Sequence, residues 1–376
     1  MKVAYFSNQF ASASGHGIAH YAKRLHDGLK MYSDLDVIPV ATGSDLSEVA
    51  KQKLQREDGL QIIPGGRKLT PLLWLSLNYP TAEGFLRENI DITHIVALGF
   101  PVATRKKLVV TVHDIGPLTH SEYFTHSKPW LFKASFKHML RYADAIICVS
   151  QATANEVLAQ AGKAVEDRLY VVHEGVDAEF FGRDPLDPYT TFTDLPSRDV
   201  PFFLAAGAMS PRKNIRRVVE AFKSVQALIP HHLVLVGGKG WDSSEIFHEL
   251  RNSAISERIH HLGYVSDEQL QALYKYADFY IHPSLFEGFG LTVLEAMAAG
   301  CPVITSNLSS LPEVAGDAAC LVDPHSVLEI SEAIEALARS PQLKQNLSRK
   351  GLARVKDFDW QETAKGVADV YRKVMA

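Results

Sequence analysis

The stretch "DFYIHPSLFEGFGLTVLEAMAAGCPVITS", residues 278–306, contains a complete strand–loop–helix–strand unit. Its two apolar runs, DFYIHP and PVITS, are continuous rather than alternating, which is typical of strands buried on both faces of a parallel sheet. Between them, Gly288 and Gly290 leave the loop backbone open, and a helix is expected from about Leu291 to Gly300. The unit predicts a doubly wound α/β fold, in which ligands bind beyond the carboxyl ends of the strands.

The same alternation of short apolar runs with longer amphipathic segments extends along the whole chain. We predict strands at residues 3–7, 37–41, 93–98, 108–112, 145–150 and 169–173 in the first half, and at 202–207, 232–237, 259–263, 278–283 and 302–306 in the second. Amphipathic helices separate them; in "NIRRVVEAFKSVQALI" the apolar residues from Ile215 to Val225 share one face, and Asn214 is the expected N-cap.

A chain of 376 residues exceeds one comfortable core, so two domains are expected. We predict a Rossmann-like acceptor domain at 1–180, a proline-rich linker at 181–200 and a Rossmann-like donor domain at 201–359. A C-terminal helix at about 360–376 is expected to pack back on the first domain. Two such domains that face each other would form a cleft.

The composition, 46% hydrophobic and 22% charged, is that of an ordinary globular protein. The formal charge of −4 gives no general attraction to nucleic acid. No apolar run approaches the length of a membrane span, and the start "MKVAYFSNQF" is typical of a first strand rather than a signal peptide. Cys148, Cys301 and Cys320 lie in apolar runs, which favours buried thiols in a reducing compartment. We therefore expect a cytoplasmic protein that can also contact the inner face of the membrane.

Two basic residues precede a predicted helix in "AAGAMSPRKNIRRVVEAF", residues 205–222. A strand ends at Gly207, and the following loop places Arg212 and Lys213 just before the helix N-terminus. Because free N–H groups and the helix dipole also attract anions there, this arrangement suits a diphosphate without requiring a metal. The alternative is an ordinary solvated basic helix start.

Glu287 and Glu295, eight positions apart, at first resemble a general acid and base. Eight residues of helix would span about 12 Å, whereas glycosidase carboxylates flank one bond at roughly 5–9.5 Å. Glu295 also lies inside the expected helix. The spacing favours two contacts on a longer ligand, although a capping glutamate followed by a helix glutamate is a common pattern.

The E-x7-E pattern within "HPSLFEGFGLTVLEAMAAGCPVITS", preceded by "GAMSPRKN", resembles the retaining nucleotide-sugar glycosyltransferases of family 4, which have the GT-B fold. The resemblance covers most of the chain. It includes "GHGIAHY" (15–21), "VTVHDIGPLTH" (110–120), "VVHEGVDAEFF" (171–181) and "SSLPEVAGDAACLVDP" (309–324). The segments "HDIGPLTH", "SPRKN" and "GGKGW" are most similar to bacterial mannosyltransferases of polysaccharide and lipopolysaccharide assembly.

This resemblance implies roles by position. Glu287 would bind donor-sugar hydroxyls and Glu295 the ribose, while Arg212 and Lys213 neutralise the leaving diphosphate and His113 faces the donor sugar. Main-chain N–H groups at Phe289, Gly290 and Leu291 would hold the diphosphate or sugar. Further implied donor-binding residues are Gly17, Gly207, Gly237, Tyr264, Val265, Gly288 and Thr292. Implied acceptor-side residues are Gly15, His16, Tyr21 and Asp114.

The chain departs from the family pattern at two positions. Many members have Arg where this chain has Ala208, and the boundary motif commonly has Asn where it has Glu174. Asp114, next to His113, is either a base or a residue that orients the backbone; we favour the second role.

The implied reaction is a retaining, front-face hexosyl transfer from a nucleotide sugar, first GDP-mannose and otherwise UDP-glucose or UDP-N-acetylglucosamine. No metal or other cofactor is expected. The D-x-D sequence at residues 34–36 precedes a strand and indicates a surface turn, and His16, His20 and His113 are too scattered to form a clear zinc set.

The acceptor is expected to be a glycan or a lipid-linked molecule. In the segment 126–145 a helix is predicted from Pro129, and Lys133, Lys137 and Arg141 share one face of it. Such a basic stripe either contacts an anionic membrane or is simply solvated.

Three other classes compete with this interpretation. An isomerase or phosphorylase could use the same two-domain fold, but the E-x7-E segment argues against the isomerase. A non-catalytic nucleotide-sugar-binding protein would be expected to lose cleft residues that this chain retains. A dehydrogenase is disfavoured because no G-x-G-x-x-G follows either first strand.

Overall fold

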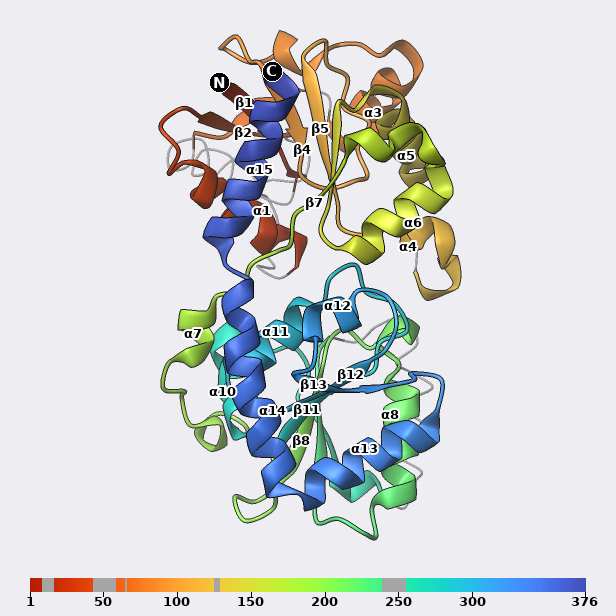
Figure 1. Ribbon diagram of the computed structural model, residues 1–376, viewed down its shortest axis with the longest axis vertical. Coiled ribbons are helices and arrows are strands. Elements are labelled where there is room, and N and C mark those ends of the chain that lie inside the picture. Colours follow the sequence, from red (N-terminus) through yellow and green to blue (C-terminus); the bar gives the residue numbers. More distant parts are fainter. Residues whose placement is uncertain (9–16, 43–58, 65, 125–128, 239–254) are drawn as a thin grey trace. The chain divides into compact units, whose positions relative to one another are not determined.

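The computed structural model describes residues 1–8, 17–42, 59–64, 66–124, 129–238 and 255–376. The chain divides into two compact units (Figure 1). Unit 1 comprises residues 1–119, 126–175 and 360–376, and unit 2 comprises 120–125 and 176–359. The stretch 181–200, predicted as a linker, is part of unit 2 in this division.

Unit 1 contains a parallel sheet with the strand order β3-β2-β1-β4-β5-β6-β7 among the described residues. Its strands are β1 (Lys2–Phe6), β2 (Asp36–Thr42), β3 (Gln61–Ile63), β4 (Ile92–Ile95), β5 (Lys107–Val112), β6 (Ala145–Cys148) and β7 (Leu169–Val171). The order reverses between β1 and β4, so their carboxyl ends open a crevice of the kind in which doubly wound sheets bind ligands.

The helices of unit 1 pack on this sheet (Figure 1). They are α1 (Ile18–Leu29), α3 (Gly66–Leu77), α4 (Gly116–Thr119), α5 (Pro129–Tyr142), α6 (Gln151–Ala161) and the C-terminal α15 (Trp360–Met375). Helix α15 runs beside α1. The contact is close because Gly28 has no side chain: a Cβ there would lie 2.8 Å from the Cβ of Ala364.

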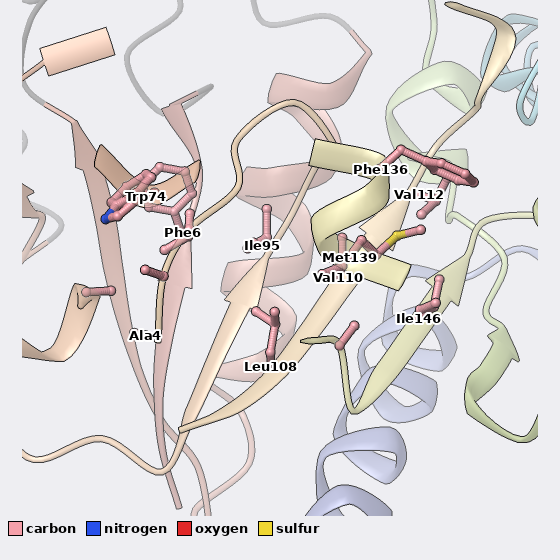
Figure 2. Close-up of a cluster of buried hydrophobic side chains, with 14 of the residues drawn as sticks. Ala4, Phe6, Trp74, Ile95, Leu108, Val110, Val112, Phe136, Met139 and Ile146 are labelled. Atoms are coloured by element: carbon pink, nitrogen blue, oxygen red, sulfur yellow. The ribbon is translucent and has the colours of Figure 1, made fainter. Parts of the chain in front are cut away.

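One face of the unit 1 sheet carries a continuous apolar cluster (Figure 2). Phe6 and Trp74 meet edge to face at 6.0 Å between ring centroids. Phe136 and Met139 from α5 cover the central strands at Val110 and neighbouring residues. Burial of these side chains provides the main stabilisation of the unit.

Unit 2 contains a second parallel sheet with the order β10-β9-β8-β11-β12-β13. Its strands are β8 (Phe202–Ala206), β9 (His232–Val236), β10 (Ile259–His261), β11 (Phe279–His282), β12 (Val303–Ser306) and β13 (Ala319–Val322). Its helices are α7 (Ala178–Gly182), α8 (Ile215–Val225), α10 (Asp267–Tyr276), α11 (Leu291–Ala298), α12 (Leu311–Ala315), α13 (Val327–Arg339) and α14 (Pro341–Arg354). Numbered from β8, this is the 3-2-1-4-5-6 order of a Rossmann sheet.

The predicted fold class, two doubly wound α/β domains, is confirmed by these two parallel sheets. A strand lies at each predicted position, but β3 and β13 were missed. Both are short and lie at sheet edges; β3 has only the residues Gln61–Ile63, and β13 is partly exposed although its residues are apolar. In the described residues no helix is long and apolar enough to cross a membrane.

Helix α8 has the predicted apolar face, and Asn214 is at its N-cap as predicted, but without the capping hydrogen bond. Ile215 and Phe222 on that face are buried. Asn214 occupies the N-cap position with φ of 59°, and its side chain makes no cap hydrogen bond. Its amide instead donates to the carbonyl oxygens of Pro283 and Pro324, at 3.0 and 2.7 Å. The N-cap prediction was therefore wrong about what the side chain does.

Candidate active site

The candidate site of unit 2 lies at the switch point between the neighbouring strands β8 and β11. After β8, the chain forms a short 3-10 turn at Pro211–Lys213. After β11, it forms the loop that carries Glu287. Several bonds join these segments; among them, the Asn214 amide donates to the Pro283 carbonyl, and the Leu285 N–H donates to the Arg212 carbonyl at 2.9 Å.

The structure brings Arg212, Lys213 and Glu287 together at this switch point. Lys213 Nζ donates to Glu287 Oε1 at 2.7 Å, and Arg212 Nη1 donates to Glu287 Oε2. The Arg212 guanidinium also donates to the Phe286 carbonyl at 2.9 Å. Side-chain exposure is 11% for Lys213, 24% for Arg212 and 10% for Glu287, so the three charges are largely withdrawn from water.

Burial and charge act in opposite directions on the carboxyl of Glu287. Burial alone would raise its pKa, but the charges of Arg212 and Lys213 outweigh this effect and hold the pKa well below its usual range. Burial also lowers the pKa of Lys213, while the Glu287 carboxylate works against that shift. Two cations facing one carboxylate leave a net positive cluster, which can accept an anion.

Two glycines shape the strand ends beside this cluster. Gly207 has φ of +139°, and a Cβ there would lie 3.1 Å from Lys213 Cε. Gly237, also at +139°, would place a Cβ 2.0 Å from the Gly207 carbonyl oxygen. Both positions therefore need glycine: Gly237 lets its backbone approach that of Gly207, and Gly207 lets its backbone approach the Lys213 side chain.

The loop before α11 is held by two serines from the loop after β12. Ser309 Oγ donates to the Glu287 carbonyl at 2.5 Å and accepts from the Glu287 N–H at 3.3 Å. Ser310 Oγ lies 2.9 Å from the same carbonyl and 2.7 Å from that of Phe289. This double contact fixes the main chain that carries Glu287.

Helix α11 begins after Gly290, which has φ of 115°. Gly288, Leu291 and Thr292 are half-buried around this helix start, while the Phe289 side chain is buried. Unbonded N–H groups at a helix start are suited to anions, in line with the predicted role of this segment. The helix ends at Ala298 and Gly300 follows with φ of +78°, as predicted.

Glu295 lies on α11, half-buried, with Tyr274 Oη 3.5 Å from its Oε2. Tyr264 and Val265, predicted to line a base pocket, differ in access. The Tyr264 side chain is 64% exposed, whereas Val265 is buried, so only the main chain of Val265 could face a ligand.

His113 of unit 1 follows β5 and has an acceptor at each ring nitrogen. Its Nδ1 is 2.8 Å from Glu174 Oε1, and its Nε2 is 3.1 Å from the Val96 carbonyl oxygen. Tyr21 meets its ring edge to face at 4.6 Å between centroids. Glu174 is buried. It stands where the boundary motif commonly has Asn, and His113 is its hydrogen-bond partner.

Other predicted residues of unit 1 are placed as follows. Asp114 Oδ1 accepts from the Gly116 N–H at 3.0 Å, which is the backbone-orienting role favoured from the sequence. Gly17 is the N-cap of α1, with φ of 61°. Gly15 and His16 lie outside the described residues.

The D-x-D sequence lies at the amino end of β2. The Asp34 carboxylate pairs with Arg372 at 3.1 Å, and its carbonyl accepts from the N-terminal amine at 2.7 Å. Asp36 pairs with Lys2 at 3.4 Å. This is the predicted surface turn, with both carboxylates already paired. Across the described ranges, no cluster of three or more His, Cys, Asp or Glu side chains could hold a metal.

Four polar residues support the site in roles that the sequence did not predict: His282, Ser309, Ser310 and Asn214. His282 ends β11 and contacts Glu287. A histidine at the end of an otherwise apolar strand is a signal that could have been noticed. The serines offered no local signal, because their partners lie 21–23 positions away.

The fold is that of two doubly wound α/β units, one of which carries a buried cluster that can accept an anion, and two family matches give the class of protein. Residues 15–180 match the family described as Glycosyltransferase Family 4, and residues 192–354 match Glycosyl transferases group 1. The chain is 30% identical over 269 residues to O-antigen chain mannosyltransferase B of Escherichia coli, covering 71% of this chain and 70% of that protein. This chain belongs to the group 1 glycosyltransferases of family 4 and is a glycosyltransferase.

A second relative and a solved structure extend the comparison. The serotype-specific mannosyltransferase WbdA of Escherichia coli is 30% identical over 69% of this chain, which spans only 32% of that protein. The crystal structure of Anabaena HepE in complex with UDP and glucose superposes with a TM-score of 0.73 at 18% identity, covering 99% of both chains. The predicted GT-B class of the fold is thereby confirmed.

Proposed function

We propose that this protein is a hexosyltransferase that takes mannose from GDP-mannose and transfers it to a hydroxyl of a glycan or lipid-linked acceptor. The observation that carries the proposal is the buried cluster of Arg212, Lys213 and Glu287 at the switch point of unit 2. The two mannosyltransferase relatives support mannose. The UDP and glucose of the HepE structure support the alternative, a UDP-hexose.

The donor would be held at several points of unit 2. Arg212 and Lys213 bind the diphosphate, assisted by main-chain N–H groups at Phe289, Gly290 and Leu291. Glu287 accepts hydrogen bonds from sugar hydroxyls. Glu295, on α11 and half-buried, accepts from the ribose hydroxyls. The two cations match the diphosphate, and the two carboxylates match the hydroxyl groups of the sugar and the ribose on either side of it.

The proposed reaction retains the anomeric configuration by a front-face route. The bond from sugar C1 to the diphosphate oxygen breaks, and its electron pair goes to the diphosphate. The acceptor oxygen bonds to C1 from the same face, and its proton passes to a leaving phosphate oxygen. Charge therefore builds on the diphosphate, where the fixed cations Arg212 and Lys213 stabilise it. His113 of unit 1 would contact the donor sugar.

A donor panel tests the class and the sugar together. Hydrolysis and thermal shift are measured with GDP-mannose, UDP-glucose and UDP-N-acetylglucosamine. We expect the largest stabilisation and a slow hydrolysis with GDP-mannose. Stabilisation without any turnover would favour a non-catalytic binding protein. Turnover of a UDP-sugar but not of GDP-mannose would make the UDP-sugar the donor.

We further propose that the reaction needs no metal, because the cations at the cluster take the place of one. Activity should persist in EDTA. Complete loss in EDTA that Mn²⁺ restores would overturn this part of the proposal.

The two glutamates should separate kinetically. Glu287→Gln, close to the reacting sugar, is expected to lower kcat, whereas Glu295→Gln, at the ribose, is expected to raise KM. A loss at Glu295 that lies mainly in kcat would contradict this division of roles.

We propose that α5 of unit 1 contacts an anionic membrane that carries a lipid-linked acceptor. Lys133, Lys137 and Arg141 are exposed along one face of α5, and Trp130 at its start is 51% exposed. Cations next to an exposed indole are typical of surfaces that bind anionic lipid headgroups. Co-sedimentation with anionic but not zwitterionic vesicles is expected at low salt. If the protein stays in the supernatant with both kinds of vesicle, the basic face of Lys133, Lys137 and Arg141 is simply solvated.

A further inference from the structure

His282 is a buried polar side chain at the end of β11, directly beneath Glu287. It is 3% exposed. Its Nε2 lies 3.1 Å from Glu287 Oε1, and its Nδ1 lies 2.9 Å from the Tyr280 hydroxyl. Ser284 Oγ is 3.1 Å from the same Nε2. None of the roles assigned above uses this histidine.

The neighbours of His282 determine which of its nitrogens carries the proton. Burial, together with the charge of Lys213, lowers the pKa of His282 to about 4, so the ring is neutral at neutral pH and has a single N–H. The ionised carboxylate of Glu287 can only accept, so this N–H is at Nε2. Nδ1 is then an acceptor, and the Tyr280 hydroxyl, 2.9 Å from Nδ1 and 3.3 Å from the Ala206 carbonyl oxygen, is the group that can donate to it.

The strand itself keeps this arrangement in place. Tyr280 and His282 are two positions apart on β11, so their side chains point to the same face of the sheet. Their rings stack at 5.7 Å between centroids. Tyr280 and Ser284 are fully buried, so the ring of His282 is held by neighbours that cannot be replaced by water without opening the core.

Glu287 therefore has three side-chain donors in the protein without ligand. Oε1 accepts from Lys213 and His282, and Oε2 accepts from Arg212. If the donor diphosphate engages Arg212 and Lys213, as in the proposed function, the carboxylate loses part of both charge partners. A carboxylate that is 8% exposed would then protonate or turn away unless another donor remained.

We infer that His282 is a positioning residue whose Nε2–H keeps Glu287 ionised and aimed at the donor sugar when the diphosphate draws Arg212 and Lys213 away. The inference rests on the proposed function. It deepens that function by separating two tasks at one carboxylate. Arg212 and Lys213 bind the diphosphate, and the neutral ring of His282 keeps its hydrogen bond to Glu287.

The charged and titratable groups around this pair must be taken into account in any pH experiment. They come from the turn after β8, from β11, from α10 and from α11: Arg212, Lys213, Tyr280, Tyr274 and Glu295. All of them remain unchanged in the variants at position 282, so a difference between those variants reports on the His282–Glu287 contact.

Three variants test the inference. His282→Leu removes the donor, His282→Gln keeps an N–H at nearly the same place, and His231→Leu removes another buried histidine of unit 2 as a matched control. We expect His282→Leu to lower kcat by roughly 10- to 150-fold, the value of one hydrogen bond to a charged group. GDP affinity should change less than about threefold on the same reasoning, because the diphosphate contacts remain.

The pH profile separates positioning from simple loss of structure. In His282→Leu, Glu287 lacks the hydrogen bond from Nε2–H and therefore protonates more readily when the nucleotide sugar is bound. The acid limb of the kcat–pH profile should then move to higher pH. His282→Gln should move the limb back toward that of the unchanged protein. His231→Leu should leave the acid limb of kcat unchanged, even if its melting temperature falls as much as that of His282→Leu.

A second measurement follows the N–H directly. Nitrogen-15 NMR of the unchanged protein should show a protonated Nε2 and an unprotonated Nδ1 at His282, and GDP should shift the Nε2–H signal. A protonated Nδ1 would overturn the inference even if His282→Leu fails to fold. An unmoved acid limb in a folded His282→Leu would also overturn it. Absence of turnover by the unchanged protein with every nucleotide sugar would instead overturn the proposed function, and with it this inference.

Discussion

Replacing Glu287 by Gln removes the carboxylate that pairs with both Lys213 and Arg212. The two cations, with 11% and 24% side-chain exposure, then lose this counter-charge while staying largely withdrawn from water. Breaking a buried pair in this way costs about 3–5 kcal/mol. For a unit of this size that corresponds to a fall in Tm of roughly 6–20 °C.

Differential scanning calorimetry of the full chain measures this change. The Lys350–Asp317 pair is a matched control, since its Nζ–Oδ2 distance is also 2.7 Å but Asp317 is 83% exposed. Asp317→Asn should therefore leave Tm nearly unchanged. The double variant Lys213→Met with Glu287→Gln should be more stable than Glu287→Gln alone, because the buried unpaired ammonium is gone.

The pH dependence has a definite sign. The pKa of Glu287 is lower in the folded protein than its ordinary value of 4.5. The pair therefore contributes its full stability above about pH 4.5, and that contribution is lost as the pH falls through the folded value. Glu287→Gln lacks this acid-side loss, so its Tm should approach that of the unchanged protein in acid. A Tm of Glu287→Gln equal to that of the unchanged protein at pH 7 would refute the reasoning.

Three further predictions concern the same switch point. Lys213→Ala should lower kcat by about 10²–10³-fold, with GDP affinity, measured by calorimetry, falling far less; an unchanged turnover rate would remove Lys213 from the machinery. Ser309→Gly and Ser309→Ala both remove the contact to the Glu287 carbonyl, so both should lose activity. Glycine also relieves the φ of 58° at this position, so the Tm of Ser309→Gly should be no lower than that of Ser309→Ala. Full activity of either variant would contradict a role for Ser309 in holding the Glu287 main chain. Gly237→Ala forces a Cβ against the Gly207 carbonyl and should reduce soluble yield and Tm, as followed by circular dichroism.

Much of the fold follows from the sequence, because its signals are local. Continuous apolar runs identify strands buried on both faces, and they predicted most of the strands. The edge strand β3 was missed because its three residues, Gln61–Ile63, are too few for such a run. The edge strand β13 does lie in an apolar run, residues 318–322, which was not predicted as a strand. The helix from Leu291 to Ala298 follows from Gly290, Gly300 and the apolar stretch between them.

The membership of the candidate site was also visible in the sequence, although its contacts were not. Arg212, Lys213 and Glu287 were singled out beside a strand end or a helix start, and Glu295 was singled out inside the following helix. Their expected partners were parts of a ligand. In the structure, Arg212 and Lys213 pair with Glu287, which is 74–75 positions away along the chain.

The spacing of side chains along the chain predicts most of the strands and helices and the residues that follow the strand ends. That β8 lies beside β11, and so that Lys213, His282 and Glu287 share one buried cluster, is visible only in the folded protein. The same holds for the pairing of His113 with Glu174, 61 positions apart. The physical reason is that strand order in a parallel sheet is set by how whole βα units pack, and a local pattern carries no record of that packing.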